Sequence, residues 1–382
     1  LFADLVPGQL KGRAQPFDSL VSFLSIDTQG IFGLPLYITA TMVLIFLLFG
    51  QLLMHTGGAT FFTDLASALM GRYRGGPAKV AVLASAFFGT VSGNTASNVL
   101  TTGVVTIPTM KRAGYTPAQA GAIEVAASTG GQLMPPVMGA AAFLMAQFLQ
   151  VPYQTVLVAA IVPSILYFLA VLVQVDLLAA RDNIRGLPSS ELPSTKAVLA
   201  KGWYMVVPFA LLIYVMFFLN KPADLAALIA TAALLLLGLV LSYGGKKLKL
   251  TDIWTAVQET GRLGADLVVV VAMAGCVIGI LQVTGLGFGL TFVLVQVGEG
   301  NMFLLLVLTA VICIILGMGM PTTAIYFLLA TLVGPPLVEL GANQLSAHLF
   351  VLYFGMLSMM TPPVAFACFV AAALAKADYW DT

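Results

Sequence analysis

Charged residues are scarce in this chain of 382 amino acids. Only 9% of the residues are Asp, Glu, Lys or Arg, while 60% are hydrophobic. Because a soluble domain carries about 25% charged residues, this composition excludes an ordinary soluble fold. The net charge of +1 offers no electrostatic basis for binding nucleic acid. Several apolar runs are long enough to cross roughly 30 Å of hydrocarbon as helices, so we expect an all-α, polytopic membrane protein.

Residues for metal binding and nucleophilic catalysis are also few. The three cysteines, Cys276, Cys313 and Cys368, lie in apolar segments and have no metal-ligand spacing. There are two histidines and no His-Glu-x-x-His motif, which argues against an intramembrane hydrolase. We therefore expect no enzyme activity, no catalytic residue, no transition metal and no organic cofactor.

Glycine, proline and threonine recur at a spacing of 228 residues (284 − 56). Thr56-Gly57 recurs as Thr284-Gly285, and Pro135-Pro136 recurs, one residue short of that spacing, as Pro362-Pro363. The other matches are Gly89 with Gly317, Thr95-Ala96 with Thr323-Ala324, and Pro108 with Pro336. Paired interruptions of this kind in two apolar halves are typical of a transporter binding site.

The repeat divides the chain into five predicted segments. They are an N-terminal extension over 1–30, a first repeat over 31–176, a cytoplasmic loop over 177–202, scaffold helices over 203–262 and a second repeat over 263–382. Each repeat contains a helical hairpin, at 78–110 and 301–337, and a helix broken by Gly and Pro, at 116–149 and 344–375. Elements at both ends lack counterparts, so we expect further helices upstream and a missing final helix.

Basic residues predict the orientation of the two repeats. They flank both ends of 78–110, so both ends face the cytoplasm and the hairpin is re-entrant, with its tip near the midplane. The hairpin at 301–337 contains no Lys or Arg and opens to the outside. This threading leaves only Lys11, Arg13 and Lys221, of 17 basic residues, outside the cytoplasm. The two repeats are then inverted.

Four polar breaks interrupt the predicted helices at membrane depth. We expect 92–95 to face 128–132, and 317–323 to face 358–362, because unwound backbone is tolerated only where it is buried or lines a wet cavity. Freed carbonyls and hydroxyl oxygens suit a small hard cation, and helix N-termini suit a carboxylate. Two pseudo-symmetric cation sites with an anion between them follow. The competing interpretation is that Ser and Thr bond back to their own helix carbonyls.

Glu124 is the one acid near the breaks, and it should face protein or water. Its counterpart lies near apolar Leu352, so a structural role is favoured over a coupling role. The first hypothesis is a carrier that couples a small carboxylate to a small hard cation, since a bound cation reduces the cost of moving an anion. A proton-coupled carrier or exchanger stays open, although acids near the tips are scarce. A passive channel fits less well, because two inverted hairpins with broken partner helices suit alternating access.

Three motifs resemble the large membrane (permease, DctM-like) subunit of TRAP transporters, closest to the TAXI-type branch with fused subunits. They are residues 71–79 (Gly-Arg-Tyr-Arg-Gly-Gly-Pro-Ala-Lys), 89–98 (Gly-Thr-Val-Ser-Gly-Asn-Thr-Ala-Ser-Asn) and 127–140 (Ala-Ser-Thr-Gly-Gly-Gln-Leu-Met-Pro-Pro-Val-Met-Gly-Ala). The resemblance implies a sodium-driven, elevator-type importer of small organic acids in the cytoplasmic (inner) membrane of a prokaryote. An extracytoplasmic, periplasmic binding protein would deliver substrate. The small membrane subunit would be fused upstream and is absent here.

The same resemblance implies three sets of site residues. The first sodium site would be Ser92, Gly93, Asn94, Thr129 and Gly130. The second sodium site would be Gly317, Pro321, Thr322, Ser358 and Thr361. Substrate would face Asn94, Thr95, Asn98, Gln132 and Thr323.

Overall fold

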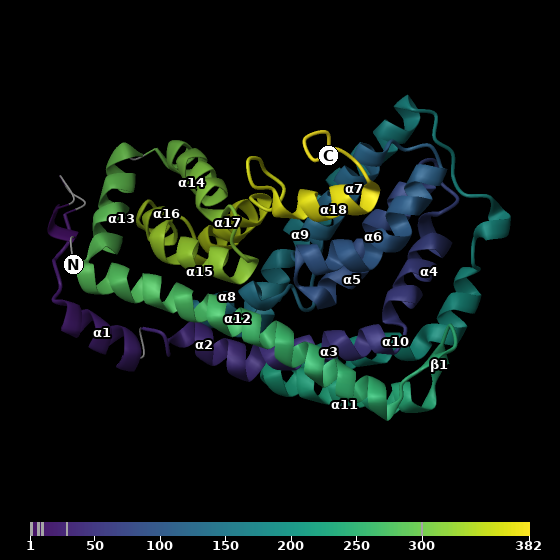
Figure 1. Cartoon of the computed structure of the whole chain (residues 1–382), viewed down its shortest axis with the longest axis horizontal. Coiled ribbons are helices and arrows are strands. Elements are labelled where there is room, and N and C mark those ends of the chain that lie inside the picture. The colour runs from purple at the N-terminus through teal and green to yellow at the C-terminus, as the bar shows by residue number, and fades with distance from the viewer. Residues whose placement is uncertain (1–2, 6–7, 9–10, 28–29, 299–300) are drawn as a thin grey trace. The chain divides into compact units, whose positions relative to one another are not determined.

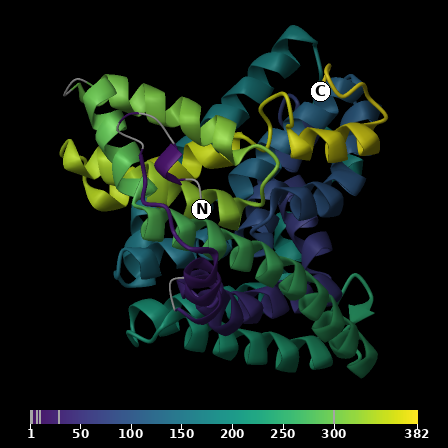
Figure 2. The same cartoon turned by 60° about the vertical axis from the view of Figure 1, so that its left-hand side comes forward.

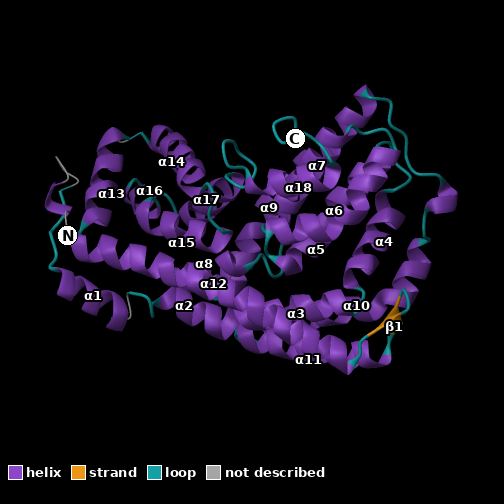
Figure 3. Cartoon of the chain, viewed as in Figure 1, coloured by secondary structure: helices purple, strands orange, loops and turns teal. Residues whose placement is uncertain are grey.

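The computed structural model describes residues 3–5, 8, 11–27, 30–298 and 301–382 and is almost entirely helical (Figure 3). Its one described sheet is a two-stranded antiparallel ribbon of β1 (Ser242–Tyr243) and β2 (Lys246–Lys247). Within the described residues, five helical stretches are long and apolar enough to cross a membrane. They are Leu34–His55, Tyr153–Arg181, Ser189–Phe217, Ala223–Val240 and Leu250–Thr284. The all-α, membrane-type architecture agrees with the prediction.

The chain forms two compact units, and each contains one predicted hairpin. The α5–α7 unit comprises Leu44–Ala142, Pro152–Arg262 and Ala365–Thr382. The α14–α17 unit comprises Leu1–Val43, Phe143–Val151 and Leu263–Val364. The chain therefore passes from one unit to the other inside both predicted broken helices, a division different from that of the sequence repeats.

Close helix packing defines the α5–α7 unit. Its helices are α3 (Leu44–His55), α4 (Gly58–Met70), α5 (Gly76–Ser92), α6 (Thr95–Arg112), α7 (Pro117–Gly131), α9 (Tyr153–Arg181), α10 (Thr195–Phe217), α11 (Ala223–Val240), the start of α12 (Leu250–Thr284) and α18 (Phe366–Ala375). Helix α7 packs against α5, α6 and α18 (Figure 1). A Cβ on Gly89 would lie 2.2 Å from the Gly131 Cα, so glycine is what allows α5 and α7 to touch. Lys111 Nζ donates to the Ala375 carbonyl at 2.6 Å and holds α18 on α6.

The α14–α17 unit is built around an apolar cluster. Its elements are α1 (Phe17–Ile26), α2 (Leu34–Ile38) with a π-helical turn (Thr39–Val43), most of α8 (Ala140–Phe148), the rest of α12, α13 (Leu286–Val297), α14 (Met302–Gly317), α15 (Thr322–Leu332), α16 (Gly334–Glu339) and α17 (Gln344–Leu357). Helices α14 and α15 both pack on α17 (Figure 2). Phe148 anchors α8 here, because its ring centroid lies 6.0 Å from that of Phe327 and 5.2 Å from that of His348.

The predicted repeat is visible in local backbone conformation. Gly57 (φ 90°) and Gly285 (φ 73°) are both left-handed and immediately precede α4 and α13. A side chain is disfavoured at such a φ, which explains why glycine recurs. Helix α13 was not among the predicted elements, although the recurrence of Thr-Gly before it marks it as the counterpart of α4.

All four predicted breaks are present. Helices α5 and α6 separate at left-handed Gly93 (φ 56°), and α14 and α15 at left-handed Gly319 (φ 77°). Each Pro-Pro segment contains a cis peptide bond and follows the end of α7 or α17. The predicted cytoplasmic loop 177–202 is shorter in the structure, since α9 continues to Arg181 and α10 begins at Thr195. Ser194 caps α10 by accepting a hydrogen bond from the Ala197 N–H at 3.2 Å.

Candidate functional site

The hairpin tip of the α5–α7 unit is stabilised by its own polar groups. Asn94 is the N-cap of α6, and its side-chain oxygen accepts a hydrogen bond from the Ser97 N–H at 3.1 Å. A Cβ on Gly93 would lie 2.4 Å from the Gly139 Cα, so the tip packs against the segment between α7 and α8. The side chain of Ser92, the first predicted sodium ligand, lies outside the described part of the structure.

Two oxygen atoms close to this tip are buried without a partner. Gln132 Nε2 donates to Thr95 Oγ1, which joins the end of α7 to the start of α6. Gln132 Oε1 and Thr129 Oγ1 have no hydrogen-bond partner among the described residues, and both residues are at most 2% exposed. An unsatisfied buried polar group costs about 1–3 kcal/mol. A cation or a donor from a ligand would satisfy these two oxygens, so the residues present fit the predicted site.

Two other predicted site residues, Gly130 and Asn98, make contacts that hold the helices together. A Cβ on Gly130 would lie 2.2 Å from the Tyr167 ring, so Tyr167 fills the space that a side chain at this position would need. Asn98 is fully buried, and its Nδ2 donates to the Ser85 carbonyl at 3.0 Å and the Ser128 carbonyl at 3.4 Å. The Asn98 amide therefore connects α6 to both α5 and α7.

The α14–α17 unit contains the whole second predicted set and places Gly317 against Ser358. A Cβ on Gly317 would lie 2.6 Å from Ser358 Oγ, so α14 and α17 meet at their breaks. Thr322 Oγ1, in the first turn of α15 after Pro321, is buried and has no hydrogen-bond partner among the described residues. Ser358 and Thr361 instead donate to carbonyls of their own segment, at 2.6 and 2.7 Å. Their hydroxyl oxygens keep lone pairs for a further contact.

The predicted substrate residues are divided between the units. Asn94, Thr95, Asn98 and Gln132 belong to the α5–α7 unit, whereas buried Thr323 belongs to the α14–α17 unit. Thr309, in the middle of α14, was not predicted. Its hydroxyl is fully buried and has no partner among the described residues. A lone hydroxyl residue in an otherwise apolar helix is the sequence signal that marks it.

Glu124 lies at the centre of a cluster of four hydroxyls, which we call the hydroxyl cage. The cage consists of Ser85, Thr102, Thr106 and Ser128. Their oxygens lie 3.0, 2.5, 2.5 and 3.2 Å from the Glu124 carboxyl oxygens, and Glu124 itself is 0% exposed. The expectation that Glu124 faces protein or water is confirmed, with protein on every side. The cage was not predicted, although Asn98, Thr102 and Thr106 follow one another at four-residue spacing along one face of α6.

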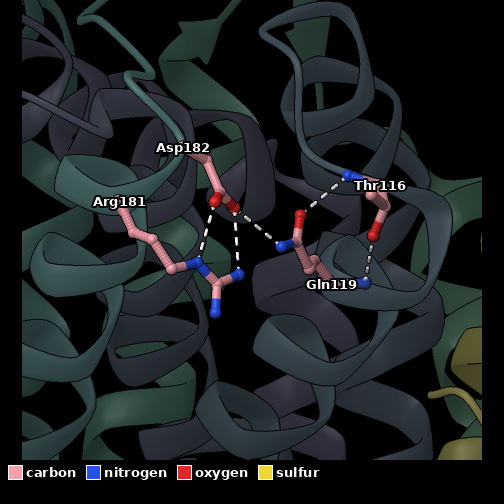
Figure 4. Close-up of polar contacts among 4 residues, drawn as sticks. All are labelled: Thr116, Gln119, Arg181 and Asp182. Carbon is pink, nitrogen blue, oxygen red and sulfur yellow. Dashed lines mark hydrogen bonds and ion pairs between the residues drawn. The ribbon is translucent and has the colours of Figure 1, made fainter.

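Polar contacts outside the helical core set the start of α7 (Figure 4). Thr116 and Gln119 form a reciprocal capping box, with N···O distances of 2.9 and 3.2 Å. Gln119 Nε2 also donates to Asp182, at the end of α9, at 2.8 Å. Hydrogen bonds from Arg181 first, and then from Gln119, lower the pKa of the Asp182 carboxyl below its ordinary value. Helix α7 is thereby fixed to α9 at the end away from the break.

Known proteins supply an independent comparison. The profile of the family described as "Tripartite ATP-independent periplasmic transporter, DctM component" matches residues 25–382. The chain is 26% identical to the C4-dicarboxylate TRAP transporter large permease protein DctM of Pseudomonas aeruginosa, over 86% of this chain and 76% of that one. It is 25% identical to the sialic acid TRAP transporter permease protein SiaT of Haemophilus influenzae, over 91% of this chain and 54% of that one. The chain is 24% identical to the isethionate TRAP transporter permease protein DctMQ of Oleidesulfovibrio alaskensis, over 94% of this chain and 54% of that one.

These relatives are transport permeases and not enzymes, as the sequence predicts. The family works in a membrane, together with a substrate-binding protein and a small membrane subunit. The match extends over both hairpins and both broken helices, so it includes every break described above. The chain therefore belongs to the DctM component family of tripartite ATP-independent periplasmic (TRAP) transporters.

Proposed function

We propose that this chain is the permease of a sodium-coupled importer of small organic acids. The observation that carries the proposal is a set of buried oxygens at the breaks that have no hydrogen-bond partner in the described part of the chain, on Thr129 and Gln132 in one unit and on Thr322 in the other. Hard monovalent and divalent cations prefer such oxygen ligands. The named substrates of three relatives, C4-dicarboxylate, isethionate and sialic acid, are all organic anions, which supports an acid as substrate.

The roles of the site residues follow from this assignment. Sodium, as co-transported cargo, would take the hydroxyls of Thr129 and Thr322 and the carbonyls of Gly93 and Gly317 beside the two hairpin breaks. The first turn of α6 and the first turn of α15 each offer free N–H groups, which favour the carboxylate of a substrate. Moving a cation with the anion lowers the net charge that crosses the membrane, which is the reason for coupling.

Inverted repeats and an elevator motion belong to the same proposal. Matching left-handed glycines at Gly57 and Gly285, and matching Pro-Pro breaks, support two copies of one structural plan. Opposite insertion follows from the distribution of Lys and Arg under the positive-inside rule. We propose residence in the cytoplasmic membrane of a prokaryote, a periplasmic binding protein as substrate donor, and a small membrane subunit as partner.

Sodium-dependent uptake into proteoliposomes tests the assignment. The full-length parent protein, its small subunit and its binding protein would be reconstituted with and without an inward sodium gradient. Thr129→Ala and Thr322→Ala each remove a buried oxygen, so the sodium concentration for half-maximal uptake should rise about tenfold or more, equivalent to about 1.4 kcal/mol.

Matched controls are Thr101→Ala and Thr331→Ala, whose hydroxyls donate to their own helix carbonyls at 2.8 and 2.9 Å. Both controls should keep the sodium dependence of the parent. The proposed cation sites would be overturned if the sodium concentration for half-maximal uptake changed equally in all four variants, or if uptake did not depend on sodium. Proton coupling is the second candidate, and the hydroxyl cage around Glu124 is the observation that favours it.

A further inference from the structure

Glu124 is a buried carboxyl group that has no charged partner among the described residues. It is 0% exposed, in the middle of α7, and its four hydrogen-bond partners are the neutral hydroxyls of the cage. A buried carboxylate that lacks a counter-charge is costly, so an ion or a proton must offset it. The hydroxyl oxygens approach the carboxyl at 2.5–3.2 Å, which are direct hydrogen bonds that leave no room for a metal ion between them. The proton is the cation that fits.

Among the residues that the structure describes, no ionisable group on a neighbouring segment forms an ion pair with Glu124. On the helices packed against α7 and on the C-terminal segment they are Lys79, Lys111, Arg112, Tyr153, Tyr167, Asp176, Arg181, Cys368, Lys376, Asp378, Tyr379 and Asp381. Lys79 pairs with Asp176 at 2.6 Å, and Lys111 is bound to the Ala375 carbonyl. Arg181 pairs with Asp182 at 2.8 Å. Tyr167 donates to the Ala126 carbonyl at 2.7 Å.

The hydroxyl cage can satisfy both protonation states of Glu124. With the carboxylate charged, its hydroxyls donate to the two carboxyl oxygens. With a proton bound, the new O–H can donate to Thr106 Oγ1, and Thr106 can turn its own hydrogen to the Thr102 carbonyl at 2.9 Å. Thr102 has the same choice, because the Asn98 carbonyl lies 2.8 Å from its oxygen. Proton gain or loss therefore needs only hydroxyl rotations, with no buried group left unpaired.

The second repeat lacks the cage, so the fold does not require it. At the spacing of 228 residues, Ser85, Thr102 and Thr106 correspond to Cys313, Ala330 and Gly334, and Glu124 corresponds to Leu352. These counterparts are buried too, and they pack without polar contacts around a carboxyl. The helices can therefore assemble around apolar side chains at these positions, which argues that the acid has a function beyond packing.

The cage is continuous with the proposed cation site. Ser128 directly precedes Thr129 on α7, and Thr102 donates to the carbonyl of Asn98, one turn nearer the hairpin tip. Asn98 in turn binds the Ser128 carbonyl. When Thr102 or Ser128 donates its hydrogen bond to a different acceptor, the contacts of the segment that carries Thr129 and Gln132 therefore change as well.

We propose that Glu124 binds and releases one proton during the transport cycle and that this proton contributes to coupling alongside the cation sites. The proton comes from water on the side to which the site is open and forms an O–H bond on one Glu124 oxygen. On release, that bond breaks and the proton returns to water on the other side. The inference rests on the proposed function of the chain as a transport permease.

Infrared difference spectroscopy of the reconstituted full-length protein tests proton binding without any transport. A change of pH should alter the carbonyl band of a protonated carboxylic acid in the parent protein, and Glu124→Gln should remove that band. The matched control, Thr106→Val, keeps the carboxyl and deletes one hydroxyl, so its band should persist with a displaced midpoint. Absence of a band that depends on both pH and Glu124 overturns the proposal.

Uptake measurements separate this proposal from the proposed function. Uptake driven by an inward proton gradient should fall about tenfold or more in Glu124→Gln, while substrate exchange at equal pH on both sides should change by less than about twofold. A purely structural acid would instead lower both activities together, in Glu124→Gln and in Thr106→Val alike. Sodium-dependent uptake with a pH profile unchanged by Glu124→Gln would overturn the proton site and leave the sodium importer standing. If uptake does not depend on sodium but the infrared band still titrates with Glu124, the sodium importer is overturned and the proton site stands.

Discussion

Single glycines decide which backbones can meet in each unit. Gly89 on α5 lies against Gly131 on α7, with only 2.2 Å between an imagined Gly89 Cβ and the Gly131 Cα. In the other unit, Gly317 lies against Ser358, where a Cβ would lie 2.6 Å from the hydroxyl oxygen. Both contacts join a hairpin helix to a broken helix beside the candidate site. The recurrence of Gly89 as Gly317 thus has a steric cause.

Gly89→Ala should destabilise the α5–α7 unit. The added methyl meets backbone, which cannot rotate away, so overpacking should lower the free energy of unfolding by about 1–3 kcal/mol. The control is Gly261→Ala on α12, where nothing lies within 4 Å of the new Cβ, and alanine should stabilise the helix by about 0.5–1 kcal/mol. Thermal unfolding in detergent would compare them. A Gly89→Ala variant as stable as Gly261→Ala would contradict the steric account.

At the scale of single residues, the sequence predicted where the backbone breaks but not which side chains form hydrogen bonds with one another. Gly93, Pro135 and Pro362 mark the breaks because their backbone chemistry interrupts helices wherever it occurs. The hydrogen-bond partners of Glu124 and Asn98 depend on which faces of three helices meet, and periodicity does not specify that. The four-residue spacing of hydroxyls on α6 was the available signal, and it needed a known partner helix to be interpreted.

Helix ends in this chain are specified by local polar contacts. The Thr116–Gln119 capping box begins α7, Asn94 caps α6 and Asn343 caps α17. These residues lie within four positions of the groups they bind, so sequence alone predicts most helix ends to within a few residues. The exceptions are α9, α10 and α12, which extend beyond the predicted bounds at 176, 203 and 263, because hydropathy shows where a membrane could be and not where a helix stops.

Loss of the capping box should shorten or weaken α7. Thr116→Ala removes the side-chain acceptor for the Gln119 N–H, so the free energy of unfolding should fall by about 0.5–2 kcal/mol. Thr116→Ser keeps the hydroxyl and should stay near the parent protein. Hydrogen exchange of the first turn of α7 and the thermal midpoint would both report the change. Equal protection in the alanine and serine variants would rule out a role for the cap.

The contact of Asp182 with Arg181 and Gln119 predicts a pH dependence. Its folded-state pKa is lowered from the ordinary value of 3.8, so the stabilisation is present above 3.8 and is lost as pH falls through the folded-state pKa. The effect should be small because the carboxyl is solvent-exposed. Thermal midpoints of the parent and Asp182→Asn should differ at neutral pH and converge in acid. A difference in thermal midpoint that grows as the pH falls would contradict the prediction that the ionised carboxylate stabilises the fold.

At the scale of the whole chain, the same local backbone features occur twice with different side-chain chemistry around them. Both repeats contain a Thr-Gly turn, a hairpin and a Pro-Pro break, and the sequence predicted each of them. The passage of the chain between units inside each broken helix was not predicted, because helical periodicity indicates an apolar face and not the unit against which that face packs.

The predicted orientation of α10 in the membrane can be measured with single cysteines. In a variant with Cys276, Cys313 and Cys368 replaced by alanine, Ser190→Cys between α9 and α10 should react only from the cytoplasm. Lys221→Cys between α10 and α11 should react only from outside. A membrane-impermeant maleimide on intact cells and on inverted vesicles would make the comparison. Labelling of both sites from the same side would contradict the orientation.

The chain crosses from one unit to the other at each broken helix, and this has a consequence for biosynthesis. Phe143–Val151 packs with a unit whose other helices lie mostly in Leu263–Val364, so it leaves the ribosome more than a hundred residues before most of its partners. Helix α18 is made after everything it packs on, and it adds to α6 and α7 last. Nascent α8 therefore needs lipid, the insertion machinery or a temporary neighbour to cover it. Translation must reach residue 357 before the α14–α17 unit has all of its described helices, and residue 375 before the α5–α7 unit has all of its own.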